Sequence, residues 1–279
     1  MKLKRIFALF IAALMIISLC ACVPENGGNI ASSTQGEPPQ TSVGSDPGDP
    51  AHISDPGYSV VFHGKVMSKD SGAVLMIDEE KKDEKSALYT VDLNIAIFDE
   101  DGKEIDESAL SPGTLVDVTY SGLVLEQYPG ILVSATEIRV VGFGGNIADM
   151  YLSAIGELWN EDKALNNGVS MIALDLSEAG NLSEAEKGAV AQIMLNRYGF
   201  EVFRATAEEL DARGLIDKES KAFKDGVLFA ISDEEIKDGI FSFTAMKWKS
   251  ALGAVGFSAK AEEASSGEWA YVRGNIFMA

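Results

Sequence analysis

The chain has 279 residues, with 43 acidic, 23 basic and two histidine side chains, which gives a formal net charge of −20 at pH 7. Phosphate backbones and anionic lipid headgroups are bound by clustered Lys and Arg, and none of the expected basic runs is present. The composition therefore argues against a nucleic-acid partner and leaves solubility as the expected role of the acidic stretches.

The first 22 residues have the three-part layout of a secretory signal. Three basic residues precede a run from Ile6 to Leu19 without charge or proline, and small residues and two cysteines follow. The run is too short to cross about 30 Å of hydrocarbon comfortably as a permanent helix. An uncleaved N-terminal anchor helix is the alternative interpretation.

The end of this leader distinguishes ordinary secretion from lipidation. The segment Leu19-Cys20-Ala21-Cys22 resembles the lipobox of bacterial lipoproteins. The resemblance implies removal of a signal peptide over residues 1–21, acylation of Cys22 on its sulfur, and a place on the extracytoplasmic face of the cell membrane. Each buried methylene of an acyl chain contributes about 0.8 kcal/mol, so two or three chains hold a protein on a bilayer. With Cys22 acylated, the mature chain has no thiol left for a disulfide.

Residues 22–57 are predicted to be a disordered linker. Six of the eight prolines lie between Val23 and Gly57, among Gly, Ser, Thr, Asn and Asp and almost no large apolar side chain. Such a composition cannot bury enough surface to offset the entropy cost of ordering. The expected span, on the order of 30 to 40 Å, would lift the following domains off the lipid surface.

Residues 58–143 are predicted to form an all-β domain. Five runs of strand length, rich in Val, Ile, Thr and Tyr, are separated by turn residues: Tyr58–Val66, Gly72–Asp78, Ala87–Ile95, Thr114–Tyr120 and Ile131–Val141. The third and fourth runs alternate polar and apolar residues, which indicates a sheet with one buried face. With a short helical or loop insertion near Asp106–Leu110, the pattern favours a small closed or nearly closed OB-like barrel over a short sandwich.

Three segments of this domain look like the YobA-like domains, which are small OB-like modules of unknown function in secreted and lipid-anchored proteins of Gram-positive bacteria. They are Gly64–Val66, Leu110–Val118 and Gly122–Gly130, the last containing Glu126-Gln127-Tyr128-Pro129-Gly130. Gln127 stands where that family usually has Ser. The resemblance implies the fold and the location, and it assigns no activity.

The loop around Tyr128 is the candidate ligand-contact site. Polar groups of Glu126 and Gln127 could orient a glycan or peptide on which the Tyr128 ring stacks. The alternative is purely structural, with Pro129 and Gly130 ending a strand and the ring covering the end of the barrel.

Metal ligands are sparse in the sequence. The loop Asp99-Glu100-Asp101-Gly102 offers carboxylates that calcium prefers, but it lacks the spaced oxygen ligands and distal Glu of an EF-hand. His63 has no Cys or second His nearby to share a metal. We therefore expect neither a metal nor a cofactor.

Residues 147–279 are predicted to form an α+β domain with helices first and an antiparallel sheet last. A helix with one apolar face is predicted to begin at Ile147, with Asn146 as its cap. Two more helices are predicted by the capping-box pairs Ser183/Glu186 and Thr206/Glu209, and they are expected to end at Gly199 and Gly214. The expected strands are Val169–Leu176, Val227–Ser232, Ile240–Lys249, Ala251–Ala261 and Glu268–Asn275.

The closing segment from Phe243 to Tyr271 is broadly similar to the last strands of cystatin-like or NTF2-like domains, which wrap a curved sheet around a long helix. The strand expected at Val169–Leu176, between helices, departs from the simplest cystatin order. Trp248 and Trp269 are interpreted as sheet-packing residues, with ligand platforms as the alternative.

Catalysis requires convergent groups, and the sequence offers few. The two histidines are His52 in the linker and His63 in the first domain, so His-dependent triads are not expected. The leading hypothesis is a non-catalytic surface lipoprotein that binds an envelope or extracellular partner, either a peptide or a glycan. The alternatives are a carboxylate-dependent hydrolase, whose NTF2-like cone would supply the pocket, and an inhibitor or immunity-type protein that binds one secreted enzyme.

Overall fold

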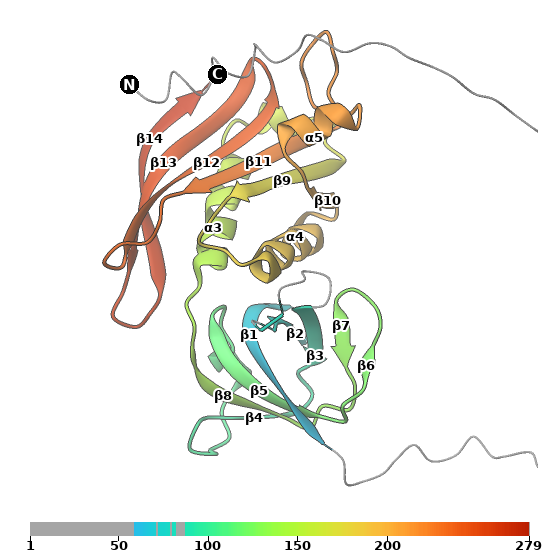
Figure 1. Ribbon diagram of the computed structural model, residues 1–279, viewed down its shortest axis with the longest axis vertical. Helices are drawn as coiled ribbons and strands as arrows, with labels where there is room; N and C mark the ends of the chain where they lie inside the picture. Colours follow the sequence, from blue (N-terminus) through green and yellow to red (C-terminus); the bar gives the residue numbers. More distant parts are fainter. Residues whose placement is uncertain (1–58, 71, 79, 82–86, 279) are drawn as a thin grey trace, which may run out of the picture. The chain divides into compact units, whose positions relative to one another are not determined.

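The computed structural model describes residues 59–70, 72–78, 80–81 and 87–278, which all belong to one compact unit of the chain (Figure 1). The signal peptide, Cys22 and the linker fall outside these residues. Of the described residues, 46% are in strands and 20% in helices, and the strands form two mixed sheets. The mostly β composition agrees with the sequence prediction.

The first sheet has eight strands in the order β4-β8-β5-β1-β2-β3-β7-β6. Neighbours pair antiparallel except for β4 with β8 and β3 with β7, which are parallel. The 3-10 helix η1 (Glu107–Ala109) lies where the insertion was expected. The strands are β1 (Val60–Asp70), β2 (Ala73–Ile77), β3 (Leu88–Asp92), β4 (Ala96–Phe98), β5 (Thr114–Tyr120), β6 (Val124–Leu125), β7 (Gly130–Leu132) and β8 (Glu137–Phe143).

This sheet does not close into a barrel. The single strand predicted over residues 131–141 is two strands, because the chain turns between Leu132 and Glu137 with Ser134 at a φ of 53°. An L-residue at positive φ ends extended structure. As a result β7 pairs with β3 and β8 pairs with β5, at two separate places in the hydrogen-bonded order.

Both faces of the strands at the centre of this sheet are buried, where one buried face was expected. Val66, Val74 and Met76 lie in a core of the first sheet's own residues. Their neighbours in sequence, Met67 and Leu75 among them, lie in a second core that also contains the helices of the following segment. Because successive side chains of a strand point to opposite faces of the sheet, the two sets of residues lie in different cores.

The second half of the chain follows the order predicted for it, with one additional strand. Its elements are α3 (Ile147–Asn160), η2 (Lys163–Asn166), β9 (Met171–Glu178), α4 (Glu184–Tyr198), β10 (Glu201–Arg204), α5 (Ala207–Ala212), β11 (Gly226–Asp233), β12 (Ile240–Ser250), β13 (Gly253–Glu263) and β14 (Trp269–Met278). Strand β10 is the one that the sequence did not predict. The sheet order is β10-β9-β11-β12-β13-β14.

The direction of pairing changes within this second sheet. Strand β9 is parallel to both β10 and β11, whereas β11 to β14 form the expected antiparallel meander. Helices α3 and α4 cover one face, and α5 lies in a separate core on the other face with Leu210, Phe223 and Leu228. Aromatic side chains fill the space between α3 and the meander, such as Tyr151 with Phe243, whose ring centroids are 5.2 Å apart.

Both predicted capping boxes are present. The Ser183 hydroxyl accepts from the Glu186 amide while the Glu186 carboxylate accepts from the Ser183 amide, and Thr206 and Glu209 repeat the arrangement. Gly199 ends α4 in the left-handed region at a φ of 68°. Asn146 occupies the cap position of α3, but its Oδ1 accepts from the Trp269 amide at 2.7 Å instead of capping the helix.

Helix α4 contacts both sheets. It packs on β10 on one side and on β1, β2 and β3 on the other. The Lys65 Nζ donates to Glu186 Oε1 at 2.9 Å, and both side chains are nearly inaccessible to solvent. The division into domains at 58–143 and 147–279 stays a prediction, since these segments share one hydrophobic core.

Candidate functional site

The carboxyl ends of β9 and β10 form the first candidate site. The chain leaves β9 towards α4 on one face of the sheet and leaves β10 towards α5 on the opposite face. Neighbouring parallel strands whose connections diverge in this way leave a crevice at their carboxyl ends, and ligands of open α/β sheets bind in such crevices. Here a hollow of about 380 Å³ is lined by Leu174, Asp175, Leu176, Ser177, Glu184, Arg204, Ala205, Thr206 and Glu209.

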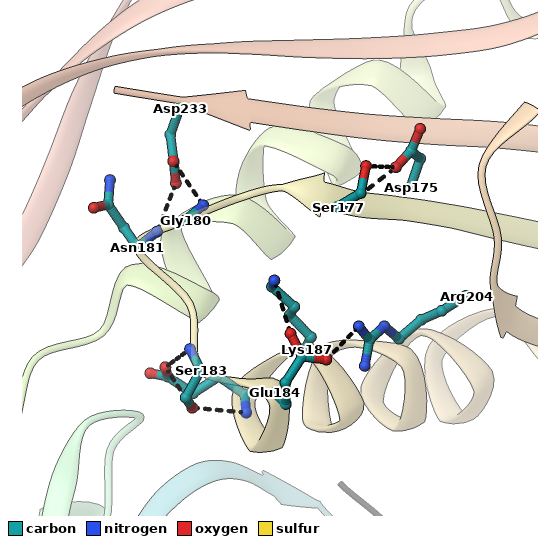
Figure 2. Close-up of polar contacts among 10 residues, drawn as sticks. Asp175, Ser177, Gly180, Asn181, Ser183, Glu184, Lys187, Arg204 and Asp233 are labelled. Atoms are coloured by element: carbon teal, nitrogen blue, oxygen red, sulfur yellow. Dashed lines mark hydrogen bonds and ion pairs between the residues drawn. The ribbon is translucent and has the colours of Figure 1, made fainter. Parts of the chain in front are cut away.

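Charged side chains of α4 and β10 meet on one side of this crevice (Figure 2). Arg204 Nη2 donates to Glu184 Oε2 at 2.6 Å, and Lys187 Nζ donates to Glu184 Oε1 at 2.9 Å. These bonds to Arg204 and Lys187 hold the pKa of the Glu184 carboxyl below its usual value. Glu184 is therefore ionised at neutral pH and acts as an anion shared between two cations.

The other side of the crevice is formed by the end of β9. The Ser177 hydroxyl donates to Asp175 Oδ1 at 2.6 Å, and Ser177 is exposed (Figure 2). The next turn is fixed by Asp233, which accepts from the Gly180 and Asn181 amides at 2.8 and 3.2 Å. Asp233 also accepts from the Tyr151 hydroxyl at 2.6 Å, and burial together with this carboxylate raises the pKa of Tyr151 far above its usual value.

The crevice can bind polar groups, and two of its carboxylates, Glu184 and Glu209, do not have the properties of a general acid. A general acid at neutral pH needs a raised pKa. Glu184 has the opposite shift, and Glu209 is exposed and occupied in its capping box. Burial does raise the pKa of Asp149, but that residue lies on α3 and does not line the crevice.

A second hollow, of about 540 Å³, is mainly apolar and contains the predicted ligand-contact residue Tyr128. Tyr128 belongs to the β6–β7 loop, and the opposite wall is formed by α4 and β10. We call this hollow the β10 groove; its lining residues are Tyr128, Ala191, Gln192, Leu195, Val202, Phe203 and Arg204. Arg204 lines both hollows, so the groove and the crevice adjoin at the end of β10.

The structure separates the three residues predicted to contact a ligand. Tyr128 lines the β10 groove and is 46% exposed. Glu126 and Gln127 are exposed in the same loop but do not line the groove. The loop places the ring towards α4 and leaves the two polar side chains in solvent.

The other singled-out residues have structural partners. His63 Nδ1 lies 2.6 Å from Asp117 Oδ1, a cross-strand pair on the exposed side of β1 and β5. Asp99 Oδ1 accepts from the Lys103 amide and closes a tight turn. Trp269 packs on Phe241, with ring centroids 5.1 Å apart, and Trp248 packs against the α5 core.

No group of three or more His, Cys, Asp or Glu side chains among the described residues could hold a metal ion. Among the helices of residues 59–70, 72–78, 80–81 and 87–278, none is long and apolar enough to cross a membrane.

Comparison with known proteins gave no match to this chain among family models, curated proteins or solved structures. The resemblances to YobA-like and to cystatin-like or NTF2-like domains therefore stay predictions.

Sequence reasoning missed the residues that join the two hollows. Arg204 lies on a four-residue strand that was not predicted, and its partner Glu184 is 20 positions away in the chain. The sequence did contain a signal for both residues. Glu184 directly follows Ser183, a predicted helix cap, and Arg204 lies two residues before Thr206, the next predicted cap. Two consecutive capping boxes mark the starts of two helices, and the strand ends that precede them are where crevices form.

Proposed function

We propose that the chain is a lipid-anchored cell-surface protein that binds an extracellular polypeptide in the β10 groove and has no catalytic role. The observation that supports binding is the groove itself, an apolar hollow of about 540 Å³ beside the last strand of a sheet. Binding sites are typically concave and apolar with few polar groups, and this hollow has that character.

The partner is a peptide in this proposal because large apolar side chains are exposed in the groove and in the segment that precedes the Tyr128 loop. Leu195 on α4 is 39% exposed, and Leu123 and Leu125 are more than half exposed beside the Tyr128 loop. Clustered exposed apolar residues favour a protein partner over a glycan.

The anchor follows from the lipobox resemblance at Leu19–Cys22, and the finer fold assignment belongs to the same proposal. In this proposal the strands of residues 58–143 are an OB-like barrel that is opened by the break at Ser134, and the parallel pairing of β7 with β3 supports it. OB folds are partly open barrels whose exposed faces and loops bind extended ligands.

Binding is tested with the full-length protein and polypeptides released from the envelope and the culture medium. Leu195→Lys places a charge in the groove and should reduce specific capture about tenfold or more. Leu252→Lys is the matched control, because Leu252 is 91% exposed in the β12–β13 turn and does not line the groove. Equal capture by both variants would refute binding in the groove. A stoichiometric complex with one secreted enzyme would identify the partner and make the protein an inhibitor.

The anchor is tested by mass spectrometry of the protein isolated from its membrane. The expected N-terminal residue is Cys22 with a thioether-linked diacylglycerol. An unmodified thiol, or a chain that retains residues 1–21, would remove the cell-surface assignment.

A polar ligand in the crevice is the second candidate, favoured by its position at the carboxyl ends of diverging parallel strands. The set of polar groups there, Asp175, Ser177 and Arg204, suits a glycan. Titration with soluble wall oligosaccharides should shift the amide resonances of these residues and not those of Leu195. Shifts confined to Leu195 and its neighbours would assign the ligand to the groove.

A further inference from the structure

The outer edge of β10 carries backbone groups that point away from the sheet. The Ala205 amide donates to the Leu174 carbonyl at 3.1 Å, so Ala205 faces β9. Alternate residues of a strand direct their amide and carbonyl to opposite sides. The amide and carbonyl of Val202 therefore face outwards, and within the described residues the sheet order ends at β10.

The β10 groove lies along this edge. Val202 and Phe203 of the strand line it together with Ala191 and Leu195 of α4, and Tyr128 stands opposite. A polypeptide that extended the sheet beside β10 would direct every second side chain towards α4, where the lining is apolar. The edge and the groove are thus complementary to one kind of ligand, an extended chain with apolar residues at alternate positions.

The charges near the groove favour a basic ligand. The chain has a formal net charge of −20, and Glu201 and Glu126, next to or near lining residues in the sequence, are both exposed. Arg204 lies at the end of the groove, but its guanidinium is paired with Glu184. A positively charged peptide is attracted to such a surface and gains in association rate.

We infer that the partner is an extended segment of a basic polypeptide, with apolar residues at alternate positions, that adds to β10 as an additional strand. The inference rests on the proposed function and specifies the chemistry of its ligand. Backbone hydrogen bonds to Val202 hold the segment, and the apolar wall of α4 selects its side chains.

The test uses the full-length protein and a synthetic eight-residue peptide of alternating Val and Lys as the probe. Val202→Pro removes the outward amide without removing a bond to β9, and proline is tolerated at sheet edges. It should weaken binding about tenfold, because one hydrogen bond to the ligand is lost and the proline ring obstructs pairing. Val202→Ala, which retains the amide but loses part of the apolar side chain that lines the groove, should weaken binding clearly less than Val202→Pro does.

A second measurement does not depend on the folding of any variant. The same peptide N-methylated at alternate backbone amides cannot pair as a strand on its methylated side, and two versions methylated in the two registers cover both orientations. At least one version should bind about tenfold more weakly to the wild-type protein. Unchanged binding of both versions and of Val202→Pro, or no binding of the unmodified peptide, would overturn strand addition.

The outcomes separate this inference from the proposed function. Loss of captured polypeptide with Leu195→Lys, together with unchanged binding on N-methylation, would leave a peptide-binding groove that does not use strand pairing. Equal capture by Leu195→Lys and Leu252→Lys would refute both peptide binding in the groove and strand addition at β10.

Discussion

The two ends of the second sheet differ in how their edges are protected. At β14 the Trp269 amide is bonded to Asn146, and the pairing with β13 is interrupted by an irregularity between Phe257 and Ala259. Arg273 of β14 pairs with Glu157 of α3 and with Glu161, the residue that follows this helix. At β10 the edge is four residues long and borders an apolar groove. We call these the long edge and the short edge.

This difference indicates which edge is available to a partner. Exposed strands invite pairing with other chains, and proteins blunt them with bulges, charges or bonded side chains. The long edge has these protective features, even though Val272 on it is 77% exposed. Its greater length therefore does not make it the better docking site. The short edge is protected by its length of four residues, and the apolar side chains beside it are complementary to an extended ligand.

The largest expected effect is on the free energy of unfolding, through the ion pair that holds α4 beside the short edge. Glu186→Gln removes an anion that pairs with buried Lys65 and should lower the free energy of unfolding by about 3 kcal/mol, because a buried charge loses an opposite charge that offsets its desolvation. Glutamine preserves the capping box, so the loss reports the ion pair. Denaturant unfolding measures it, and the double variant Lys65→Met/Glu186→Gln should recover most of the stability. A single variant as stable as the wild type would show that the pair does not fix α4.

A pH-dependent effect is expected on the side of the long edge. Lys247 Nζ donates to the Glu161 and Asp162 carbonyls at the end of α3, and burial lowers the pKa of Lys247 to about 8. Between pH 8 and 10.5 the unfolded chain retains a proton that the folded chain has released, so the contribution of Lys247 to stability rises with pH across this window.

The measurement compares the wild type with Lys247→Met by denaturant unfolding at pH 7.5 and pH 10. The wild type should gain about 2 kcal/mol relative to the variant between these values. A constant difference between the two proteins would show that the Lys247 pKa is not lowered.

The protection of the long edge itself is tested by Asn146→Ala. Removing the acceptor leaves the Trp269 amide without its side-chain partner and should cost about 1 kcal/mol. Faster hydrogen exchange of the Trp269 amide would locate the effect. Unchanged exchange would mean that another group protects this end of β14.

The smallest effect is expected at the turn that leads into the short edge. Gly199 ends α4 at a positive φ, so Gly199→Ala should cost about 1 kcal/mol or less without changing the pairing of β10 with β9. Thermal unfolding measures the loss. A larger effect would indicate that this turn also sets the position of β10.

Structural features whose determinants are local were predictable from the sequence, and features that depend on distant segments were not. Both capping boxes and the strand over residues 114–120 formed as expected, because their determinants lie within a few residues. The turn at Ser134 and the strand β10 were missed, since neither has a strong local signal and β10 depends on pairing with β9.

The candidate site was predictable only in part. Tyr128 was singled out from its loop, and it lines the β10 groove. The opposite wall comes from α4 and β10, more than 60 positions further along the chain, and no periodicity relates such distant segments. The ion pair of Lys65 with Glu186 spans 121 positions and was missed for the same reason.

The position of α4 between two sheets sets an order of events during biosynthesis. A chain emerges N-terminus first, so the strands β1 to β3 are made before the helix that covers their second face. Met67, Leu75 and Leu88 therefore stay in contact with water or a chaperone until the chain has reached α4. A translation arrest between these points would leave a fragment with an uncovered apolar face, prone to aggregate.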